Sequence, residues 1–159
     1  MLLPFFREFG WEATVLAVSP DQVASPIDGW LEQELPNDLE VIRVQALGLG
    51  WSRIPGLGTL DYRALGALKR AGDELLKRKH FDLVYFSTTV FGAHVLGPRW
   101  HAKFSVPFVM DYQDPWVCDY YQIHPDITPP GGRLKYALTQ WLARYNEPKV
   151  IKACGGITA

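Results

Sequence analysis

The sequence predicts an α/β protein with a mostly parallel sheet. Short apolar runs rich in β-branched residues alternate along the chain with segments whose apolar residues recur at helical spacing. No internal repeat or low-complexity tract interrupts this alternation. Strands that alternate with helices are typical of parallel sheets joined by helical crossovers. At 159 residues, the chain has the length of about one domain.

The apolar runs predict five strands, and the first, third and fourth are expected to be buried. The side chains of the second alternate between the two faces of the strand, and this strand is expected nearer an edge of the sheet. The fifth begins in the last five residues. The predicted strands are Glu12–Val18, Leu39–Gln45, Phe81–Ser87, Val106–Asp111 and the run from Gly155.

Three segments predict helices. Apolar residues fall at helical spacing from Asp61 to Lys79, with charged side chains such as Arg63 among the outward positions. The segment Val90–Phe104 is helix-like but interrupted at Gly97 and Pro98. The third helix has an apolar stripe that we expect to face the core, and Pro148 is expected to bend or break it. That stripe consists of Leu134, Ala137, Leu138, Trp141, Leu142 and Tyr145.

The remaining long segments are expected to be loops. Pro20–Asn37 contains three prolines, and Leu47–Thr59 contains four glycines. The glycines do not match the G-x-G-x-x-G fingerprint of a dinucleotide site, because Arg53 stands three residues after Gly50. A flexible loop is the expected reading of this segment, with contact to an acceptor substrate as the alternative.

Composition excludes several classes of protein. The net charge of -1 argues against an electrostatic nucleic-acid binder. The two cysteines, Cys118 and Cys154, form no metal or disulfide framework, which favours a reducing compartment. The N-terminal segment lacks the basic region and cleavage site of a signal peptide. We therefore expect a cytoplasmic protein.

The stretch "PFVMDYQDPWVCDYY" carries the main candidate site. In parallel sheets ligands bind beyond the carboxyl ends of strands, and Asp111 and Asp114 directly follow a predicted strand. Pro115 restricts the residue before it to extended backbone and so fixes where Asp114 points. The same rule selects Ser87, Thr88 and Thr89, and also Ser19 and Pro20. A capping role for the two aspartates is the structural alternative, and the residues alone leave both open.

Metal and nucleophile chemistry find no support in the sequence. His94 and His101 are seven residues apart, without an acidic partner at the spacing of a zinc motif, so His94 is expected to be a packed or surface residue. No G-x-S-x-G nucleophile elbow occurs, and neither cysteine has a histidine at a recognised spacing. We expect no metal and no cofactor.

Four stretches resemble the group-1 glycosyltransferases of the GT-B class. "FREFGWEATVLAV" is similar to their first-helix and second-strand segment, and "FDLVYFSTTVFGAHVLG" to a later strand and helix. "VPFVMDYQDPWVCDYY" resembles the D-x-R-D-P-W segment of one branch of the family. "NEPKVIKACGGITA" is similar to the family segment of the form "lErkvlrrAdaittvS". These matches extend in order from Phe5 to Ala159, and the D-x-x-D-P-W block is the most specific of them.

The resemblance implies that residues 1–159 are part of a doubly wound, Rossmann-like N-terminal domain that binds the acceptor. It implies a retaining, metal-free transfer from a nucleotide-sugar, bound by a C-terminal domain, to a glycan or lipid-linked acceptor. The implied catalytic residues are Asp114 and Asp111. The implied acceptor-binding residues are Gln113, Trp116, Tyr120, Thr88, Thr89 and His94, with the two aromatics stacking on sugars. Gln113 stands where relatives carry histidine or arginine, so no charge-pairing role is carried over to it.

The same resemblance predicts that the sheet lacks a strand. Relatives begin with a strand and a glycine-rich turn before the first helix, whereas this chain begins inside that helix. The absent strand would be the central one in the order 3-2-1-4-5-6, and its two neighbours would lack a partner. We therefore expect a fragment that is inactive and poorly folded by itself.

Two other functions remain open on the sequence. One is a non-catalytic half that docks an acceptor or contacts the inner face of a membrane peripherally and works with a separate donor-binding chain. The other is a different Rossmann-like enzyme, such as a relative of nucleotide-sugar epimerases. The failed glycine fingerprint argues against the second.

Overall fold

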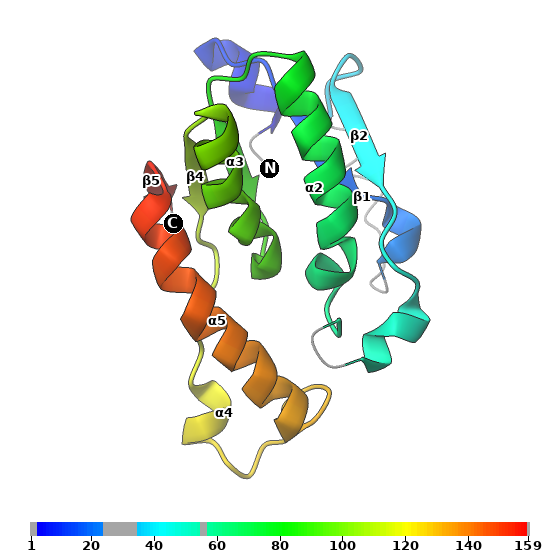
Figure 1. The fold of residues 1–159 in the computed structure, drawn as a ribbon, viewed down its shortest axis with the longest axis vertical. Coiled ribbons are helices and arrows are strands. Elements are labelled where there is room, and N and C mark those ends of the chain that lie inside the picture. The colour runs from blue at the N-terminus through cyan, green and yellow to red at the C-terminus, as the bar shows by residue number, and fades with distance from the viewer. Residues whose placement is uncertain (1–2, 24–34, 55–56, 159) are drawn as a thin grey trace.

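The computed structural model describes residues 3–23, 35–54 and 57–158, and most of the predicted loop Pro20–Asn37 lies outside them. The protein is mixed α/β, with parallel strands and helices alternating along the chain (Figure 1). The strands are β1 (Thr14–Val18), β2 (Glu40–Val44), β3 (Val84–Ser87), β4 (Phe108–Asp111) and β5 (Gly156–Thr158). The helices are η1 (Leu3–Phe9), η2 (Pro20–Gln22), η3 (Leu49–Arg53), α2 (Leu60–Arg78), η4 (Phe91–Val95), α3 (Leu96–Phe104), α4 (Tyr120–Ile123) and α5 (Arg133–Ala153).

The strands form two separate parallel sheets. One contains β1 and β2, and the other has the order β3-β4-β5. The central strand β4 buries Phe108 and Met110 on the face that carries the helices. The prediction that Phe81–Ser87 is buried throughout was wrong, since Phe86 alone is buried in β3. Within the described residues β3 is the edge strand of its sheet, so one of its sides has no neighbouring strand there.

Helix α2 follows from its sequence pattern, and the prediction of its span is confirmed. Asp61 lies in its first turn and Lys77 and Arg78 in its last, which suits the helix dipole. The prediction that Arg63 points outward was wrong, because its side chain is only 6% exposed. The guanidinium donates a 2.6 Å hydrogen bond from Nη1 to the carbonyl of Leu47, so a long polar side chain ties the glycine-rich segment to the helix.

The interruption predicted at Gly97 and Pro98 takes a different form. A 3₁₀-helix, η4, passes directly into α3, and Pro98 lies in the first turn of α3, where its missing N–H costs no hydrogen bond. Gly97 allows α3 to approach the sheet closely, because a Cβ at this position would lie 2.6 Å from the ring of Phe108.

Helix α5 is not broken at Pro148, and the prediction of its buried face was wrong. It continues through Pro148 to Ala153, and Ala143 and Val150 are buried on either side of the proline, which holds both halves in place. The predicted core-facing stripe is largely exposed, with Leu134 85% and Trp141 61% exposed. In the described residues, α5 contributes three buried side chains, one of them Gln140, so helical spacing alone misjudged its buried face.

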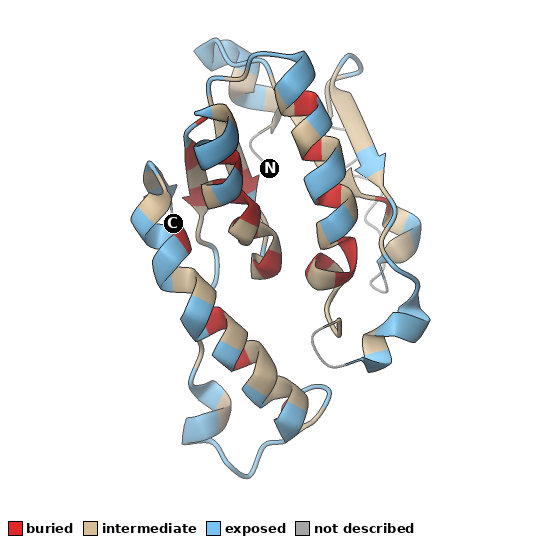
Figure 2. Ribbon diagram, viewed as in Figure 1, coloured by how far each residue is buried: buried red, intermediate tan, exposed pale blue. Residues whose placement is uncertain are grey.

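The core lies between the helices and the β3-β4-β5 sheet, as the buried residues in Figure 2 show. Its buried members are Ala64, Leu68, Phe86, Leu96, Trp100, Phe108, Met110, Trp116, Ala143 and Val150. Strands β1 and β2 have no fully buried residue, although Leu16, Val18 and Val44 pack against the same core. No helix among the described residues is long and apolar enough to cross a membrane.

Candidate functional site

Three polar side chains meet at the carboxyl ends of β3, β4 and β5. Asp111 ends β4, and its register partners are Ser87 on β3 and Thr158 on β5. Side chains of register partners project from the same face of a sheet, so the strand pairing itself brings these three groups together. The position agrees with the rule that parallel sheets present function at the carboxyl ends of their strands.

The carboxylate of Asp111 accepts hydrogen bonds at both oxygens. Gln113 Nε2 donates to Oδ2 at 2.7 Å, and Ser87 Oγ donates to the same oxygen at 3.0 Å. Thr158 Oγ1 donates to Oδ1 at 3.2 Å, and the hydroxyl of Tyr85 lies 3.3 Å from Thr158 Oγ1. We call Tyr85, Ser87, Asp111, Gln113 and Thr158 the strand-end network.

These hydrogen bonds decide the ionisation of Asp111. The bond from Gln113 is the largest cause that holds its pKa below the ordinary value, and Ser87 and Thr158 contribute in the same direction against a partial burial that raises the pKa. A carboxylate stabilised in this way stays ionised and is a weak base. Asp111 is therefore suited to orient hydroxyl and amide donors rather than to remove a proton.

The loop after β4 is fixed by Trp116. Its ring is 7% exposed and stacks on Phe91, with centroids 5.7 Å apart and an interplanar angle of 17°. Further along the loop, the N–H of Cys118 donates to Gln140 Oε1 at 3.2 Å, and Tyr136 donates its hydroxyl to the carbonyl of Cys118 at 2.6 Å. The loop is thus anchored to η4 and to α5.

Asp114 lies in this anchored loop two residues before Trp116, and it is exposed. Its carboxylate has no hydrogen-bond or ion-pair partner among the described residues. The structure therefore does not bring Asp114 into the strand-end network, although Asp111 and Gln113 of the same segment belong to it. An exposed carboxylate on an anchored loop is free to accept a hydrogen bond from a ligand.

Trp116 and His94 lie in the core, and this corrects their assignment to acceptor binding. The stacking partners of Trp116 belong to the protein, so its ring presents no open face for a sugar. His94 is fully buried, and its Nδ1 lies 3.0 Å from the carbonyl of Phe91. Burial lowers the pKa of His94, which favours the neutral imidazole. Its Nε2 has no partner among the described residues.

The other candidates lie outside the strand-end network. Thr88 Oγ1 accepts a 3.1 Å hydrogen bond from the N–H of Val90, which is a turn-capping contact, and Thr89 is exposed. Tyr120 is 47% exposed at the start of α4 and lies against the ring of His124, with centroids 4.7 Å apart. Of the two candidate aromatics, Tyr120 therefore has ring surface that a ligand can reach.

Sequence reasoning missed the contributions of Tyr85 and Thr158. Thr158 follows from the strand-end rule, because it closes a strand that pairs with β4. Tyr85 lies inside β3 rather than at its end, and it joins the network through the length of its side chain. Ser87 was selected by the rule as part of a polar turn, and here it donates directly to Asp111.

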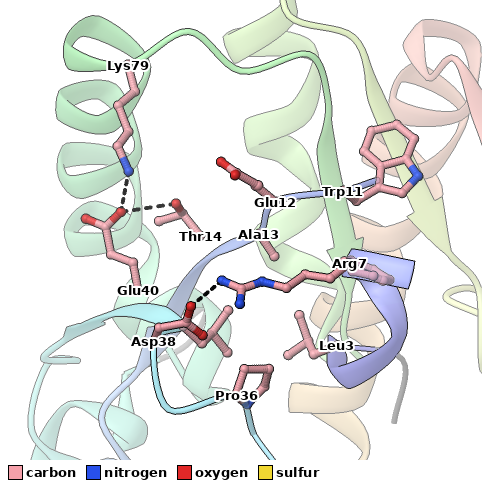
Figure 3. A pocket seen from close by; sticks show the side chains of 12 residues that line it. Leu3, Arg7, Trp11, Glu12, Ala13, Thr14, Pro36, Asp38, Glu40 and Lys79 are labelled. Atoms are coloured by element: carbon pink, nitrogen blue, oxygen red, sulfur yellow. Dashed lines mark hydrogen bonds and ion pairs between the residues drawn. The ribbon is translucent and has the colours of Figure 1, made fainter. Parts of the chain in front are cut away.

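A cavity of about 270 Å³ lies at the opposite ends of the strands, near the starts of β1 and β2 (Figure 3). Four of its charged side chains form two ion pairs, Arg7 with Asp38 at 2.5 Å and Lys79 with Glu40 at 2.5 Å, and Glu12 also lines it. Leu3, Phe6 and Trp11 supply apolar lining. Since most of its charges are paired with one another and the D-x-x-D-P-W segment lies at the other end of the strands, the strand-end network is the stronger candidate for chemistry.

A scan of protein-family models, a search of curated proteins and a search of solved structures each find no match to this chain.

Proposed function

We propose that this chain is the acceptor-side part of a glycosyltransferase that moves a sugar from a nucleotide-sugar to a glycan or lipid-linked acceptor. The observation that supports this most is the strand-end network beside the D-x-x-D-P-W segment. An ionised carboxylate at the end of β4 holds Gln113 in place, and the following loop presents Asp114 to solvent. Polar groups in this position suit the recognition of sugar hydroxyls.

We further propose that the two sheets belong to one doubly wound, Rossmann-like sheet. Each sheet is parallel, and α2 connects β2 of the first to β3 of the second. The helix packs on both strands of the first sheet and also contacts η4 and α3, which cover the second. Such sheets bind ligands outside the carboxyl ends of their strands, where the strand-end network lies.

In the proposed reaction, the acceptor oxygen forms a bond with the anomeric carbon while the bond from that carbon to the diphosphate breaks. The hydroxyl proton leaves with the diphosphate. Asp114 accepts a hydrogen bond from the acceptor hydroxyl and orients it, which contributes through positioning. Asp111 holds Gln113 and the ends of the neighbouring strands in place through its hydrogen bonds, and it remains ionised throughout.

The test uses acceptor binding and turnover. Asp114→Asn should weaken acceptor binding on a glycan array and, in an enzyme that carries a donor domain, lower turnover at least about tenfold. The melting temperature should change little, because the carboxylate has no partner to lose. Asp126→Asn, another exposed acid outside the network, is the matched control.

Two results would refute the proposal. One is unchanged acceptor binding and turnover in Asp114→Asn, which would leave the loop as architecture. The other is micromolar binding of a UDP-, GDP- or TDP-sugar to this chain in a calorimetric titration. The resemblance assigns the donor to a different domain, so a donor site here would indicate another class of enzyme.

A further inference from the structure

Helix α5 has an apolar seam on the side that faces away from the core. Its buried residues Gln140, Ala143 and Val150 lie on one side of the helix, and at about 100° per residue the opposite side carries a different set. This set, which we call the outer seam, consists of Leu134, Leu138, Trp141, Tyr145, Pro148 and Lys152. All of them are exposed except Leu138, which is half-buried.

The spacing of the outer seam is that of a coiled-coil interface. Its residues follow one another at intervals of four, three, four, three and four, so they keep to one face of α5 over about 27 Å. A seam of this width is narrower than the apolar face with which a helix covers a core. It suits one further helix, whose side chains pack into the spaces between those of α5.

The aromatic side chains of the outer seam are held in place on the surface. Trp141 stacks on Tyr145, with centroids 6.0 Å apart and an interplanar angle of 11°. Lys149 Nζ lies 3.2 Å from the centroid of the Tyr145 ring. Because these rings are already ordered, a partner that covers them loses little affinity to side-chain entropy. Tryptophan and tyrosine are also the residues that most often anchor protein interfaces.

The charge around the outer seam is positive. α5 carries five cationic side chains and one carboxylate, although the whole chain has a net charge of -1. That carboxylate belongs to Glu147, which accepts a hydrogen bond from the hydroxyl of Tyr112 on the core side of the helix. Lys149 and Lys152 have no carboxylate partner among the described residues. A partner that covers the seam is therefore favoured if it brings negative charge to this end of α5.

We propose that the outer seam of α5 docks one amphipathic helix of a partner protein, with apolar residues against the seam and carboxylates along its flanks. The apolar residues of the partner pack on Leu134, Trp141 and Tyr145. Its carboxylates pair with Lys149 and Lys152, near the carboxyl-terminal end of α5. The seam contains no residue of the strand-end network and does not contain Asp114, so the inference does not depend on glycosyl transfer.

A second copy of the chain fits the outer seam less well. Lys149 and Lys152 lie at one end of the seam, and two α5 helices packed in parallel would bring these cations together. Two antiparallel α5 helices would bring them to the amino-terminal end of the other copy, where Arg133 and Lys135 lie. Like charges therefore oppose self-association in both orientations.

An anionic lipid surface also fits less well, because a flat surface would meet more than the seam. The segment that contains α4 lies beside α5 (Figure 1). Asp119 of this segment pairs with Arg144 at 2.6 Å, and the carbonyl of Pro125 accepts a hydrogen bond from Arg133. Asp119 and Asp126 are exposed carboxylates, which an anionic surface would repel. A single helix can lie on the seam without covering them.

Two synthetic helical peptides, each of 21 residues like α5, test the proposal on the full chain. Both have leucine at the positions that face the seam. The flanking positions carry glutamate in one peptide and lysine in the other. The glutamate peptide should bind at least about tenfold more tightly than the lysine peptide in a calorimetric titration. This preference should shrink at about 1 M salt, where the screening length is about 3 Å.

Trp141→Glu should weaken binding of the glutamate peptide at least about tenfold, because it removes an anchor and sets a carboxylate against carboxylates. Its melting temperature should change little, since the side chain is exposed. Phe9→Glu introduces the same charge at another exposed aromatic residue, and this matched control should bind like wild type. If residues 1–159 are unfolded by themselves, the same titrations in an enzyme that carries a donor domain have the same outcomes.

Equal binding of the two peptides, or binding of neither, would overturn the proposal. Unchanged binding in Trp141→Glu would overturn it as well, because the peptide would then bind elsewhere. Self-association that sedimentation detects in wild type and not in Trp141→Glu would assign the seam to a second copy. Binding to vesicles of phosphatidylcholine and phosphatidylglycerol that is lost in Trp141→Glu would assign it to a lipid surface, and either result refutes the proposal. None of these outcomes affects the acceptor-binding test at Asp114.

Discussion

The two sheets of this protein are built from similar strands but are supported differently. In the β3-β4-β5 sheet, the central strand has a neighbour on both sides and alternates buried and half-buried residues. In the β1-β2 sheet, each strand has one neighbour among the residues that the structure describes, and its residues are half-buried, apart from one exposed position in β2. Strand sequence alone therefore does not determine burial, because burial also depends on which other elements pack against each strand.

The contrast extends to the polar contacts of each sheet. The strand-end network is built from register partners on three adjacent strands, so it depends on correct strand pairing. The first sheet is flanked instead by ion pairs at its amino end, Arg7 with Asp38 and Lys79 with Glu40, whose side chains are exposed. Exposed pairs of this kind contribute little to stability. The second sheet should therefore dominate the free energy of unfolding.

The largest effect is expected at Phe108. Its side chain is 1% exposed on β4 and meets the ring of Phe86 edge to face, with centroids 6.0 Å apart. Phe108→Ala should lower the free energy of unfolding by about 3–5 kcal/mol, through lost burial and the cavity left behind. Urea denaturation followed by circular dichroism measures the change.

The matched substitution in the other sheet is Leu16→Ala. Leu16 is half-buried on a strand that has one strand neighbour in the described part of the chain, so the loss should be smaller, about 1 kcal/mol. Equal losses at the two positions would show that both sheets are supported equally, and the comparison would fail. If Phe108→Ala is already unfolded in water while Leu16→Ala folds, the result would still agree with a larger contribution from the second sheet.

The features that the sequence predicted are local ones. The position of Asp111 follows from a strand-end rule, and the span of α2 follows from periodicity. The features that it missed depend on partners distant in the sequence. Trp116 is buried because η4 supplies Phe91, and Arg63 turns inward because the carbonyl of Leu47 accepts its hydrogen bond. The stripe of α5 is exposed because no described element covers it, which helical spacing cannot reveal.

The next largest effect is expected at Asp73, which links the helices that cover the two sheets. From α2 it accepts hydrogen bonds from three residues of α3: Lys103 Nζ at 2.7 Å, Arg99 Nη2 at 3.0 Å and Trp100 Nε1 at 3.0 Å. These contacts, led by Lys103, lower the pKa of Asp73 to about 2. Asp73→Asn should lower the free energy of unfolding by about 1–2 kcal/mol.

The pH dependence gives a second measurement of the same link. The pKa of Asp73 is lower in the folded chain than in the unfolded chain, so the unfolded state binds the proton more readily. The stabilisation is complete above about pH 4 and is lost as the pH falls toward about 2. The difference in stability between wild type and Asp73→Asn should shrink over this range. A constant difference from pH 7 to pH 2 would contradict the role of the ionised carboxylate.

The smallest effect is expected at Glu40, at the amino end of β2. Its carboxylate accepts hydrogen bonds from Lys79 Nζ at 2.5 Å and Thr14 Oγ1 at 3.2 Å, and the bond from Lys79 is the main cause of its lowered pKa. The side chains are 39% and 49% exposed, so water and salt screen the pair. Glu40→Gln should keep the hydrogen bonds and change the melting temperature only a little. This change should be smaller than the change that Asp73→Asn causes. Salt at about 1 M, where the screening length is about 3 Å, should remove the remaining difference from wild type. Glu8→Gln, an exposed acid on η1, is the control for a change of net charge.

If Glu40→Gln destabilises the chain as much as Asp73→Asn does, and high salt does not reduce that loss, then the ion pair is a structural support of the first sheet. The contrast between the two sheets would then lie in where their polar contacts are, and not in how much those contacts stabilise.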